Sequence, residues 1–228
     1  MAINTKDFRV KTGFIARPNG HTQNAWEVGI DIGYSSVKVF GPNADIQFPS
    51  FAEKDYSEEI GTLSPEHIKY QNLDTKERWI VGASAQNSIH QSSTSYSDGS
   101  LYQRERYDTP MFAVLIDVAL GLAITENEYG AIGDLPLKIQ TGLPSNYLRQ
   151  DRHALKEAFV GKHNFSLSVG NGQPKEFHLD ISPDDVDVME QPMGTLMSVS
   201  INSDHKFIPE AKKYLNSSIL ILDGGHGT

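Results

Sequence analysis

The sequence contains no cysteine. Disulfide bonds and thiolate metal centres are therefore excluded, and a reducing cytoplasm is the expected compartment. Long apolar runs are also missing, because the longest, from residue 111 to residue 124, is too short for a bilayer and is interrupted by Asp117. The first residues lack the apolar core of a signal peptide, so no membrane association is expected.

Basic residues are in the minority. The 20 Lys and Arg face 29 Asp and Glu, which gives a net charge of −9. An acidic chain repels the phosphate backbone of nucleic acid, so extensive direct DNA binding is not expected. Small phosphates remain possible ligands, because backbone N–H groups and one lysine can hold them whatever the net charge. The eight histidines show no metal-binding spacing.

Short apolar strands alternate with helical patterns, which predicts an α/β fold. Turn signals at residues 33–36 and at Asn171-Gly172 predict β-hairpins, so we expect a mixed sheet with flanking helices instead of a purely parallel one. Asp108 and Thr109 indicate the start of an apolar helix, with Pro110 in its first turn. The expected strands are residues 26–32, 37–40, 46–48, 77–81, 137–143, 165–169, 177–181, 186–189 and 219–222, and the other expected helices are 83–89 and 148–159.

Two segments give weaker patterns. Residues 1–25 are polar and aperiodic, and we expect them to form an N-terminal extension, a loosely ordered tail before the fold. Residues 91–104 are rich in Ser and Tyr and are expected to form a solvated surface loop. The neighbouring Arg106 and Tyr107 are interpreted as part of the same surface.

The first turn suited to bind a ligand follows the strand at residues 26–32. An aspartate, Asp31, ends that strand, and Lys38 begins the next one. The backbone N–H groups of the turn can converge on a phosphate, and Lys38 can neutralise a phosphate oxygen as a point charge. Asp31 would order the water shell of a Mg²⁺ ion, which releases its waters reluctantly. The turn residues expected to bind phosphate are Gly33, Tyr34, Ser35 and Ser36.

The second turn follows the apolar residues 219–222. Three of its residues are glycines, which let the backbone approach an anion closely, and its threonine can donate a hydroxyl. Two such turns facing one another across a cleft would grip phosphates from both sides, with one metal between Asp31 and Asp223. Neither turn has the Gly-Lys-Ser/Thr ending of a P-loop. The residues of this second turn are Asp223, Gly224, Gly225, His226, Gly227 and Thr228.

The pair of turns resembles the phosphate-1 and phosphate-2 loops of the superfamily of actin, DnaK-type chaperones and sugar kinases. Three further segments resemble the ParM-type plasmid-segregation actins within it. They are Phe48-Pro49-Ser50, the TGLP run that starts at Thr141, and the QPMGTL run that starts at Gln191. The resemblance covers about residue 26 to the end, and His226 departs from it at a position where the superfamily often has Asp or Gly.

The resemblance implies an actin-like (ribonuclease H-like) fold and roles for named residues. Asp31 and Asp223 would organise the metal, and the residues of both turns would bind nucleotide. Gln191 stands where the superfamily places a residue that orients the attacking water, and Glu190 is a second candidate because related proteins use a carboxylate nearby. The plainer alternative for Gln191 and Glu190 is a solvated helix cap before Pro192.

The domain boundaries follow from the same resemblance. Residues 26–200 would be domain I, with an inserted subdomain at about 49–107, and residues 218–228 would be the first strand and the phosphate-2 turn of domain II. Family members continue past this turn into a domain that binds the adenosine. The sequence is therefore expected to be a fragment or a truncated product.

The implied function is that of a cytoplasmic, filament-forming ATPase in plasmid DNA segregation. It would bind ATP (or GTP) with Mg²⁺, assemble with itself, and connect through an adaptor protein to the plasmid centromere. Two alternatives stay open: a small-molecule kinase of the same superfamily, and a non-enzymatic half-domain that binds a partner. Nucleotide affinity of this half alone is expected to be poor, because a binding cleft encloses its ligand from both sides.

Overall fold

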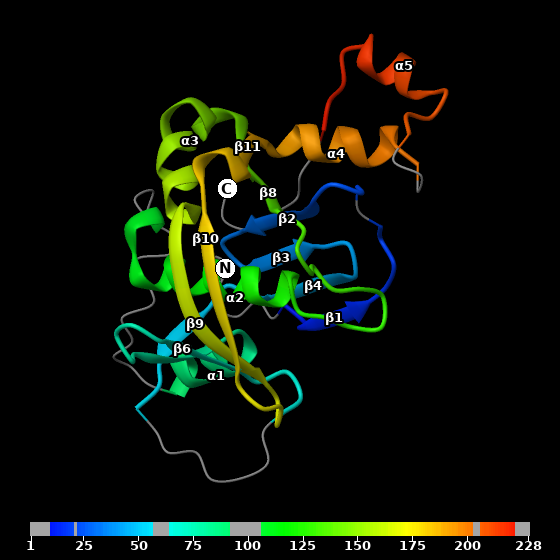
Figure 1. Ribbon diagram of the computed structural model, residues 1–228. Helices are drawn as coiled ribbons and strands as arrows, with labels where there is room; N and C mark the ends of the chain where they lie inside the picture. The colour runs from blue at the N-terminus through cyan, green and yellow to red at the C-terminus, as the bar shows by residue number, and fades with distance from the viewer. Residues whose placement is uncertain (1–9, 21, 57–63, 92–105, 203–205, 222–228) are drawn as a thin grey trace.

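A computed structural model describes residues 10–20, 22–56, 64–91, 106–202 and 206–221. These residues form two β-sheets with helices between and beside them (Figure 1). The predicted α/β class with a mixed sheet and flanking helices is confirmed.

The larger sheet has six strands and carries the candidate site. β2 (Trp26–Ile32), β3 (Ser36–Phe40), β4 (Ala44–Pro49) and β1 (Gly13–Ala16) pair antiparallel in succession. β8 (Leu137–Leu143) is parallel to β2, and β11 (Val186–Glu190) is parallel to β8. The predicted hairpin at residues 33–36 is thus confirmed, and the two parallel strands end at the same edge as β2.

The smaller sheet has five antiparallel strands. In spatial order they are β10 (Lys175–Ile181), β9 (Gly161–Val169), β6 (Ile68–Asn72), β7 (Arg78–Val81) and β5 (Ala52–Lys54). The sheet therefore combines strands from residues 49–107 with the later hairpin of β9 and β10. The short helix α1 (Ala83–Gln91) contacts β5 and β7. The inserted subdomain at residues 49–107 stays a prediction.

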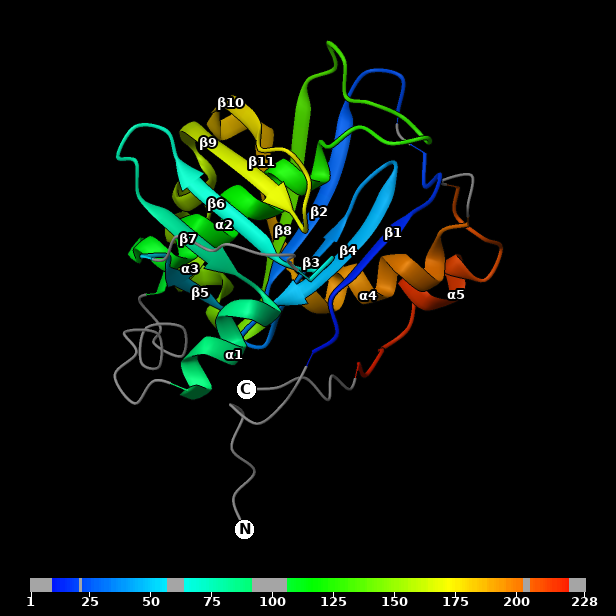
Figure 2. The ribbon, with the colours of Figure 1, turned by 90° about the horizontal axis from the view of Figure 1, so that it is seen from below.

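The helix α2 (Pro110–Ala123) lies between the two sheets (Figure 2). Thr109 caps it, because its side chain accepts a hydrogen bond from the N–H of Phe112, and Pro110 occupies the first turn as predicted. Residues from Met111 to Ala123 are buried except for Ala113. A helix that is apolar on nearly every side requires packing on nearly every side, and the two sheets provide it.

The remaining helices lie near the ends of the parallel strands. The helix α3 (Ser145–Phe159) packs on β8, β11 and α2. The helix α4 (Gln191–Ser200) follows β11 directly and contacts α5 (Ala211–Leu215). Figure 2 shows α4 and α5 beyond the six-stranded sheet, on the side away from β9 and β10. Two short 3₁₀ turns, η2 (Arg106–Asp108) and η3 (Pro183–Asp185), precede α2 and β11.

Two sequence predictions about the beginning and the end of the described chain are wrong. The extension is no loose tail over its described part, because β1 pairs with β4 and Asn19 donates 2.7 Å and 2.9 Å hydrogen bonds to Asp45 and to the Gly41 carbonyl. Residues 219–221 form no strand, and Leu220 is 82% exposed. A strand needs a hydrogen-bonded neighbour, and no described strand pairs with these residues.

Other predictions meet the limits of the described residues. The loop expected at residues 91–104 and the turn at residues 223–228 lie almost entirely outside them. Across the described part of the chain, no helix combines the length and the apolar character needed to cross a membrane.

Candidate functional site

The site is built at the end of β2. The side chains of this strand alternate, so that Trp26, Val28 and Ile30 are buried in the core while Asp31 lies on the opposite face. Lys38 of β3 is the cross-strand partner of Asp31, and its Nζ lies 3.4 Å from Asp31 Oδ2. The two strands therefore place a carboxylate and an ammonium group side by side, and both remain open to solvent.

The turn between the two strands is tightly held. The Gly33 N–H donates to the Ser36 carbonyl at 3.0 Å. A Cβ at Gly33 would lie 2.9 Å from that carbonyl oxygen, so a residue larger than glycine would force the turn to shift. Ser50, the residue after β4, also holds the turn, donating its hydroxyl to the Gly33 carbonyl at 2.8 Å and its N–H to the Ser35 carbonyl at 3.1 Å. The carbonyl groups of Gly33 and Ser35 are thus occupied by hydrogen bonds within the protein.

Gln191 reaches this corner from the first turn of α4. Its Nε2 donates a 3.2 Å hydrogen bond to Asp31 Oδ1. Gly142 on β8 makes this approach possible, because a Cβ there would lie 3.1 Å from Gln191 Cγ. The structure therefore brings together Asp31, Lys38 and Gln191 from three separate segments.

Glu190 points to a different neighbour. It is the residue before α4, and its carboxylate accepts a 3.2 Å hydrogen bond from the Ser145 hydroxyl at the start of α3. Its side chain does not cap α4. Of the two residues singled out at this strand end, Gln191 is the one bonded to Asp31.

Arg106 is a residue of this region for which the sequence prediction is wrong. It is only 9% exposed, not part of a solvated loop. Its Nη2 donates a 2.9 Å hydrogen bond to the carbonyl of Ile32, and its guanidinium carbon lies 4.4 Å from the ring centre of Tyr34. The only signal in the sequence is an arginine among aromatic residues just before a helix start, and that signal does not name a partner.

The second predicted turn lies outside the described residues. The roles expected of Asp223, Gly224, Gly225, His226, Gly227 and Thr228 therefore stay predictions. Within the described residues, no group of three or more His, Asp or Glu side chains gathers as a metal site. The carboxylate of Asp31 fits a hydrated Mg²⁺ ion, because it is a hard oxygen ligand, partly exposed, and able to accept hydrogen bonds from bound water.

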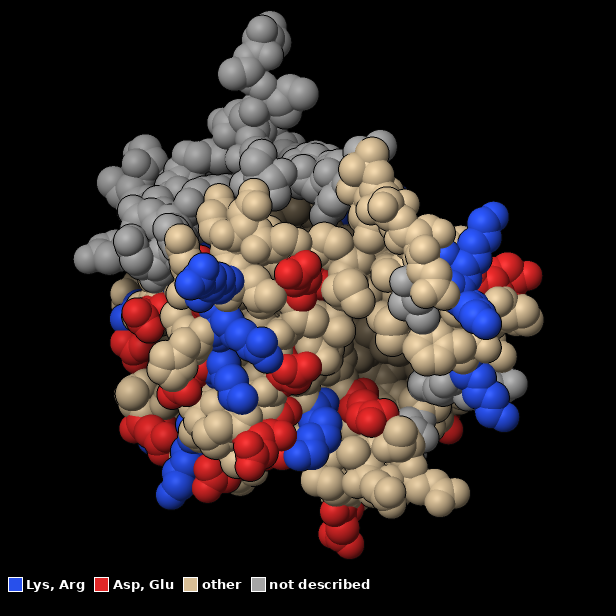
Figure 3. Space-filling view, turned by 90° about the horizontal axis from the view of Figure 1, so that it is seen from above, with Lys and Arg blue, Asp and Glu red and all other residues tan. Residues whose placement is uncertain are grey.

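The charges around this end of the molecule are mixed. Figure 3 shows acidic and basic side chains interspersed over a hollowed face. At the opposite end of the same strands, where β8 and β11 begin, Lys138 and Asp185 lie 2.7 Å apart, and this lysine together with hydrogen bonds from Ser182 lowers the pKa of Asp185.

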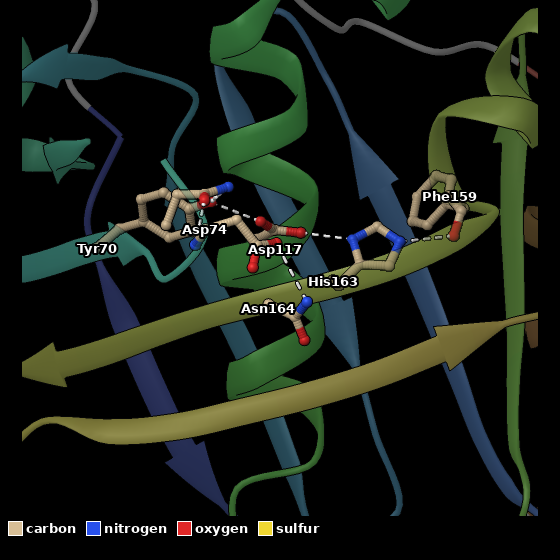
Figure 4. A network of polar contacts seen from close by, with 7 residues as sticks. Tyr70, Asp74, Asp117, Phe159, His163 and Asn164 are labelled. Carbon is tan, nitrogen blue, oxygen red and sulfur yellow. Dashed lines mark hydrogen bonds and ion pairs between the residues drawn. The ribbon is translucent and has the colours of Figure 1, made fainter. Parts of the chain in front are cut away.

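A second polar cluster lies in the core, away from this corner. Asp117 of α2 accepts a 2.7 Å hydrogen bond from the Tyr70 hydroxyl and lies 2.6 Å from Nδ1 of His163 (Figure 4). Nε2 of His163 lies 2.9 Å from the Phe159 carbonyl. Both ring nitrogens thus face acceptors, which favours the charged imidazolium. Burial opposes that charge, but the hydrogen bond and attraction of Asp117 prevail and raise the pKa of His163.

This core cluster is best explained as a structural element. It joins α2 to β6 and β9, so it fixes the helix against the smaller sheet. Burial, with the neighbouring Asp117 charge, raises the pKa of Tyr70 well above its usual value. A buried pair whose members satisfy one another is a common way to tie elements together.

Comparison with known protein families gives one match. The family model described as "Actin like proteins N terminal domain" matches residues 29–194. That span holds Asp31, the first turn, Lys38 and Gln191. No curated protein matches the sequence.

Solved structures give the same fold. The apo ParM protein of pSK41 has 20% sequence identity and a TM-score of 0.59, with 82% of this chain and 56% of that one covered. A ParM from a 15-stranded filament of Clostridium botulinum has 19% identity and a TM-score of 0.59, covering 77% and 50%. The actin-like protein Alp7A has 14% identity and a TM-score of 0.56, covering 84% and 51%. The chain thus spans about half the length of these structures.

Proposed function

The chain belongs to the actin-like proteins through their N-terminal domain, and we propose that it provides the phosphate-1 side of the nucleotide cleft in a filament-forming ATPase. The observation that carries the proposal is the convergence of Asp31, Lys38 and Gln191 beside one glycine turn. The nucleotide is ATP, with GTP as the alternative.

The chemistry follows from the types of residue in this corner. The turn holds phosphate through the N–H and hydroxyl groups of Tyr34, Ser35 and Ser36, because the Gly33 N–H already donates to the Ser36 carbonyl, and Lys38 neutralises a phosphate oxygen. Gln191 donates through Nε2 to Asp31, and its Oε1 accepts a hydrogen bond from the attacking water. Phosphoryl transfer demands mainly positioning of this kind, since the protein does little covalent chemistry.

Mg²⁺ is the implied cofactor. Asp31 and Asp223 would hold the ion through its water shell. The ion would neutralise charge on the phosphate oxygens. The hydrogen bond from Gln191 keeps the Asp31 carboxylate in one orientation for this task.

The biological role we propose is segregation of plasmid DNA in the cytoplasm. The protein assembles with itself, and an adaptor protein connects the filament to the plasmid centromere. Two observations support this. One of the similar structures is a ParM filament, and the net charge of −9 favours an adaptor over direct contact with DNA.

ATP hydrolysis and sedimentation of the full-length protein test the proposal. The protein should hydrolyse ATP with Mg²⁺ and form a polymer that pellets. Asp31→Ala should abolish hydrolysis, and Gln191→Ala should slow it about tenfold or more, equivalent to roughly 1.4 kcal/mol of barrier. Asp187→Ala is the matched control, because Asp187 is a carboxylate on β11, two strands away from β2, that pairs with Arg152 at the surface. Absence of both hydrolysis and polymer would reject the ATPase and the filament together.

A further inference from the structure

Arg106 places a positive charge where water cannot compensate it. The side chain is 9% exposed, and it belongs to η2, directly before α2. A buried guanidinium is costly unless its N–H groups and its charge find partners. Its contacts therefore indicate what holds it there.

The partners of Arg106 come from the end of β2, from the turn that follows and from the region where α2 begins. Nη2 donates to the Ile32 carbonyl at 2.9 Å, one residue before Gly33. The guanidinium carbon lies 4.4 Å from the ring centre of Tyr34 and 5.4 Å from that of Phe112. The first of these rings is inside the turn, and the second is buried in α2. The Arg106 side chain therefore contacts the main chain just before the turn and one side chain of the turn.

The other end of Arg106 is fixed to the start of α2. Its carbonyl accepts a 2.8 Å hydrogen bond from the Thr109 hydroxyl and a 3.1 Å bond from the Thr109 N–H. Thr109 in turn caps the helix. The turn is thus connected through Arg106 to the most deeply buried helix of the fold.

The contacts of the Arg106 guanidinium leave part of its hydrogen-bonding capacity unused. The structure gives this side chain a carbonyl and aromatic rings as partners, and Nη1 is buried without a hydrogen-bond acceptor among the described residues. A positive charge beneath a turn raises the local potential for an anion bound on that turn. When no anion is bound, the same uncompensated charge raises the free energy of the folded turn.

We propose that Arg106 is a positioning residue for the phosphate-binding turn. It holds the Ile32 carbonyl and the Tyr34 ring in place from below, so that the turn keeps the geometry in which its N–H groups meet a phosphate. Displacing a positioning element by about 1 Å can cost on the order of a hundredfold in rate. The inference rests on the proposed function, because it needs a phosphate ligand at the turn.

The test compares ligands that differ in phosphate. Affinities of the full-length protein for ATP, ADP and adenosine are measured by calorimetry for wild type, Arg106→Met and Arg106→Lys. Arg106→Met should weaken ATP and ADP at least about tenfold and leave adenosine nearly unchanged. Arg106→Lys should recover part of the loss, since it keeps the charge and one donor but not the planar fork.

Gly121→Ala is the control for a merely structural role. It strains the packing of α2 against Leu167 and Phe165 of β9 and meets neither Arg106 nor the turn. Its melting temperature should fall while the ratio of ATP to adenosine affinity stays at the wild-type value. If Arg106→Met fails to fold, the smaller loss expected of Arg106→Lys, measured against Gly121→Ala, supplies the same comparison.

The outcomes separate the inference from the function beneath it. If wild type binds ATP and the arginine variants keep the wild-type ratio of ATP to adenosine affinity, the positioning role is wrong and the proposed function stands. A loss that is equal for all three ligands also overturns the inference, because it indicates general damage to the fold. If wild type binds no phosphate-bearing ligand at all, the proposed function fails and the inference fails with it.

Discussion

The amide of Gln191 and the carboxylate of Asp31 are joined by a 3.2 Å hydrogen bond across 160 positions of sequence. One residue begins a helix and the other ends a strand, so the bond fixes α4 against the corner of the six-stranded sheet. It also commits the amide orientation, because Nε2 must face Asp31 and Oε1 must face elsewhere.

Replacing Gln191 by glutamate tests that orientation directly. The new carboxylate would face the Asp31 carboxylate, and two like charges at this distance repel. We expect Gln191→Glu to reduce ATP hydrolysis about tenfold or more at neutral pH and to recover partly as the pH falls and the pair takes up a proton. The pH dependence of the hydrolysis rate is the measurement. Glu190→Gln is the control, and equal losses in both variants would contradict a special role for position 191.

A methyl group at Gly142 should disturb the same contact from the other side. Its Cβ would lie 3.1 Å from Gln191 Cγ, so the glutamine must move by a few tenths of an ångström. We expect Gly142→Ala to lower the hydrolysis rate with little change in melting temperature. Gly29→Ala is a matched control on the neighbouring strand, because its Cβ meets Phe40 at ordinary distances, 3.8 Å from Cβ and 4.0 Å from the carbonyl oxygen. Equal hydrolysis rates for the two variants would show that Gln191 adjusts at no cost.

The packing of α2 predicts a stability effect without any change of polarity. A Cβ at Gly121 would lie 2.5 Å from Leu167 Cδ1 and 2.9 Å from the Phe165 ring. Overpacking of this kind costs about 1–3 kcal/mol, so Gly121→Ala should lower the free energy of unfolding by that amount. Urea unfolding measures it. Gly194→Ala in α4 should instead be neutral or stabilising, because its Cβ has only a 3.7 Å contact with Met189 Sδ. A neutral Gly121→Ala would mean that β9 moves away from α2 freely.

The buried pair of Asp117 and His163 predicts how stability depends on pH. The pKa of His163 is raised in the folded protein, above the usual 6.5. The folded state therefore binds the proton more tightly, and its stabilisation is fully present below about pH 6.5 and is lost as the pH rises through the raised pKa. We expect the free energy of unfolding to decrease as the pH rises above about 6.5, measured by urea titration at several pH values.

A substitution at His163 separates this pair from other titrating groups. His163→Gln keeps a donor for Asp117 but cannot titrate, so it should flatten the decrease in stability above neutral pH. His153→Gln is the matched control, because that histidine is exposed on α3. A decrease in stability that is the same in both variants would assign the pH dependence to other groups.

The parts of the fold predicted well are those with a strong local period. The strand WEVGIDI at Trp26–Ile32 matches its predicted bounds, and so does Leu137–Leu143. The helix α2, which ends at Ala123, is identified by its apolar spacing and its threonine–proline start. These elements are long, apolar and bounded by turn residues, so the signal is contained in neighbouring residues.

The failures share a physical cause, which is contact over long sequence distances. β1 is only four residues long and becomes a strand because β4 lies ready to pair with it. Arg106 is buried because the Ile32 carbonyl and the Tyr34 ring, more than 70 positions earlier, surround it. Asp31 and Gln191 are both identifiable from sequence, but their hydrogen bond is not. Local pattern contains no information about which distant partner a side chain will find.

The edge strand β1 has a practical consequence for handling the protein. It covers the backbone of β4, and Arg17 pairs with Asp45 just beyond it. A protein trimmed to begin at Ala25 would leave the backbone donors and acceptors of β4 uncovered along its apolar length. Uncovered strand edges recruit other chains, so trimming should yield a preparation prone to aggregation, and an affinity tag belongs ahead of residue 10.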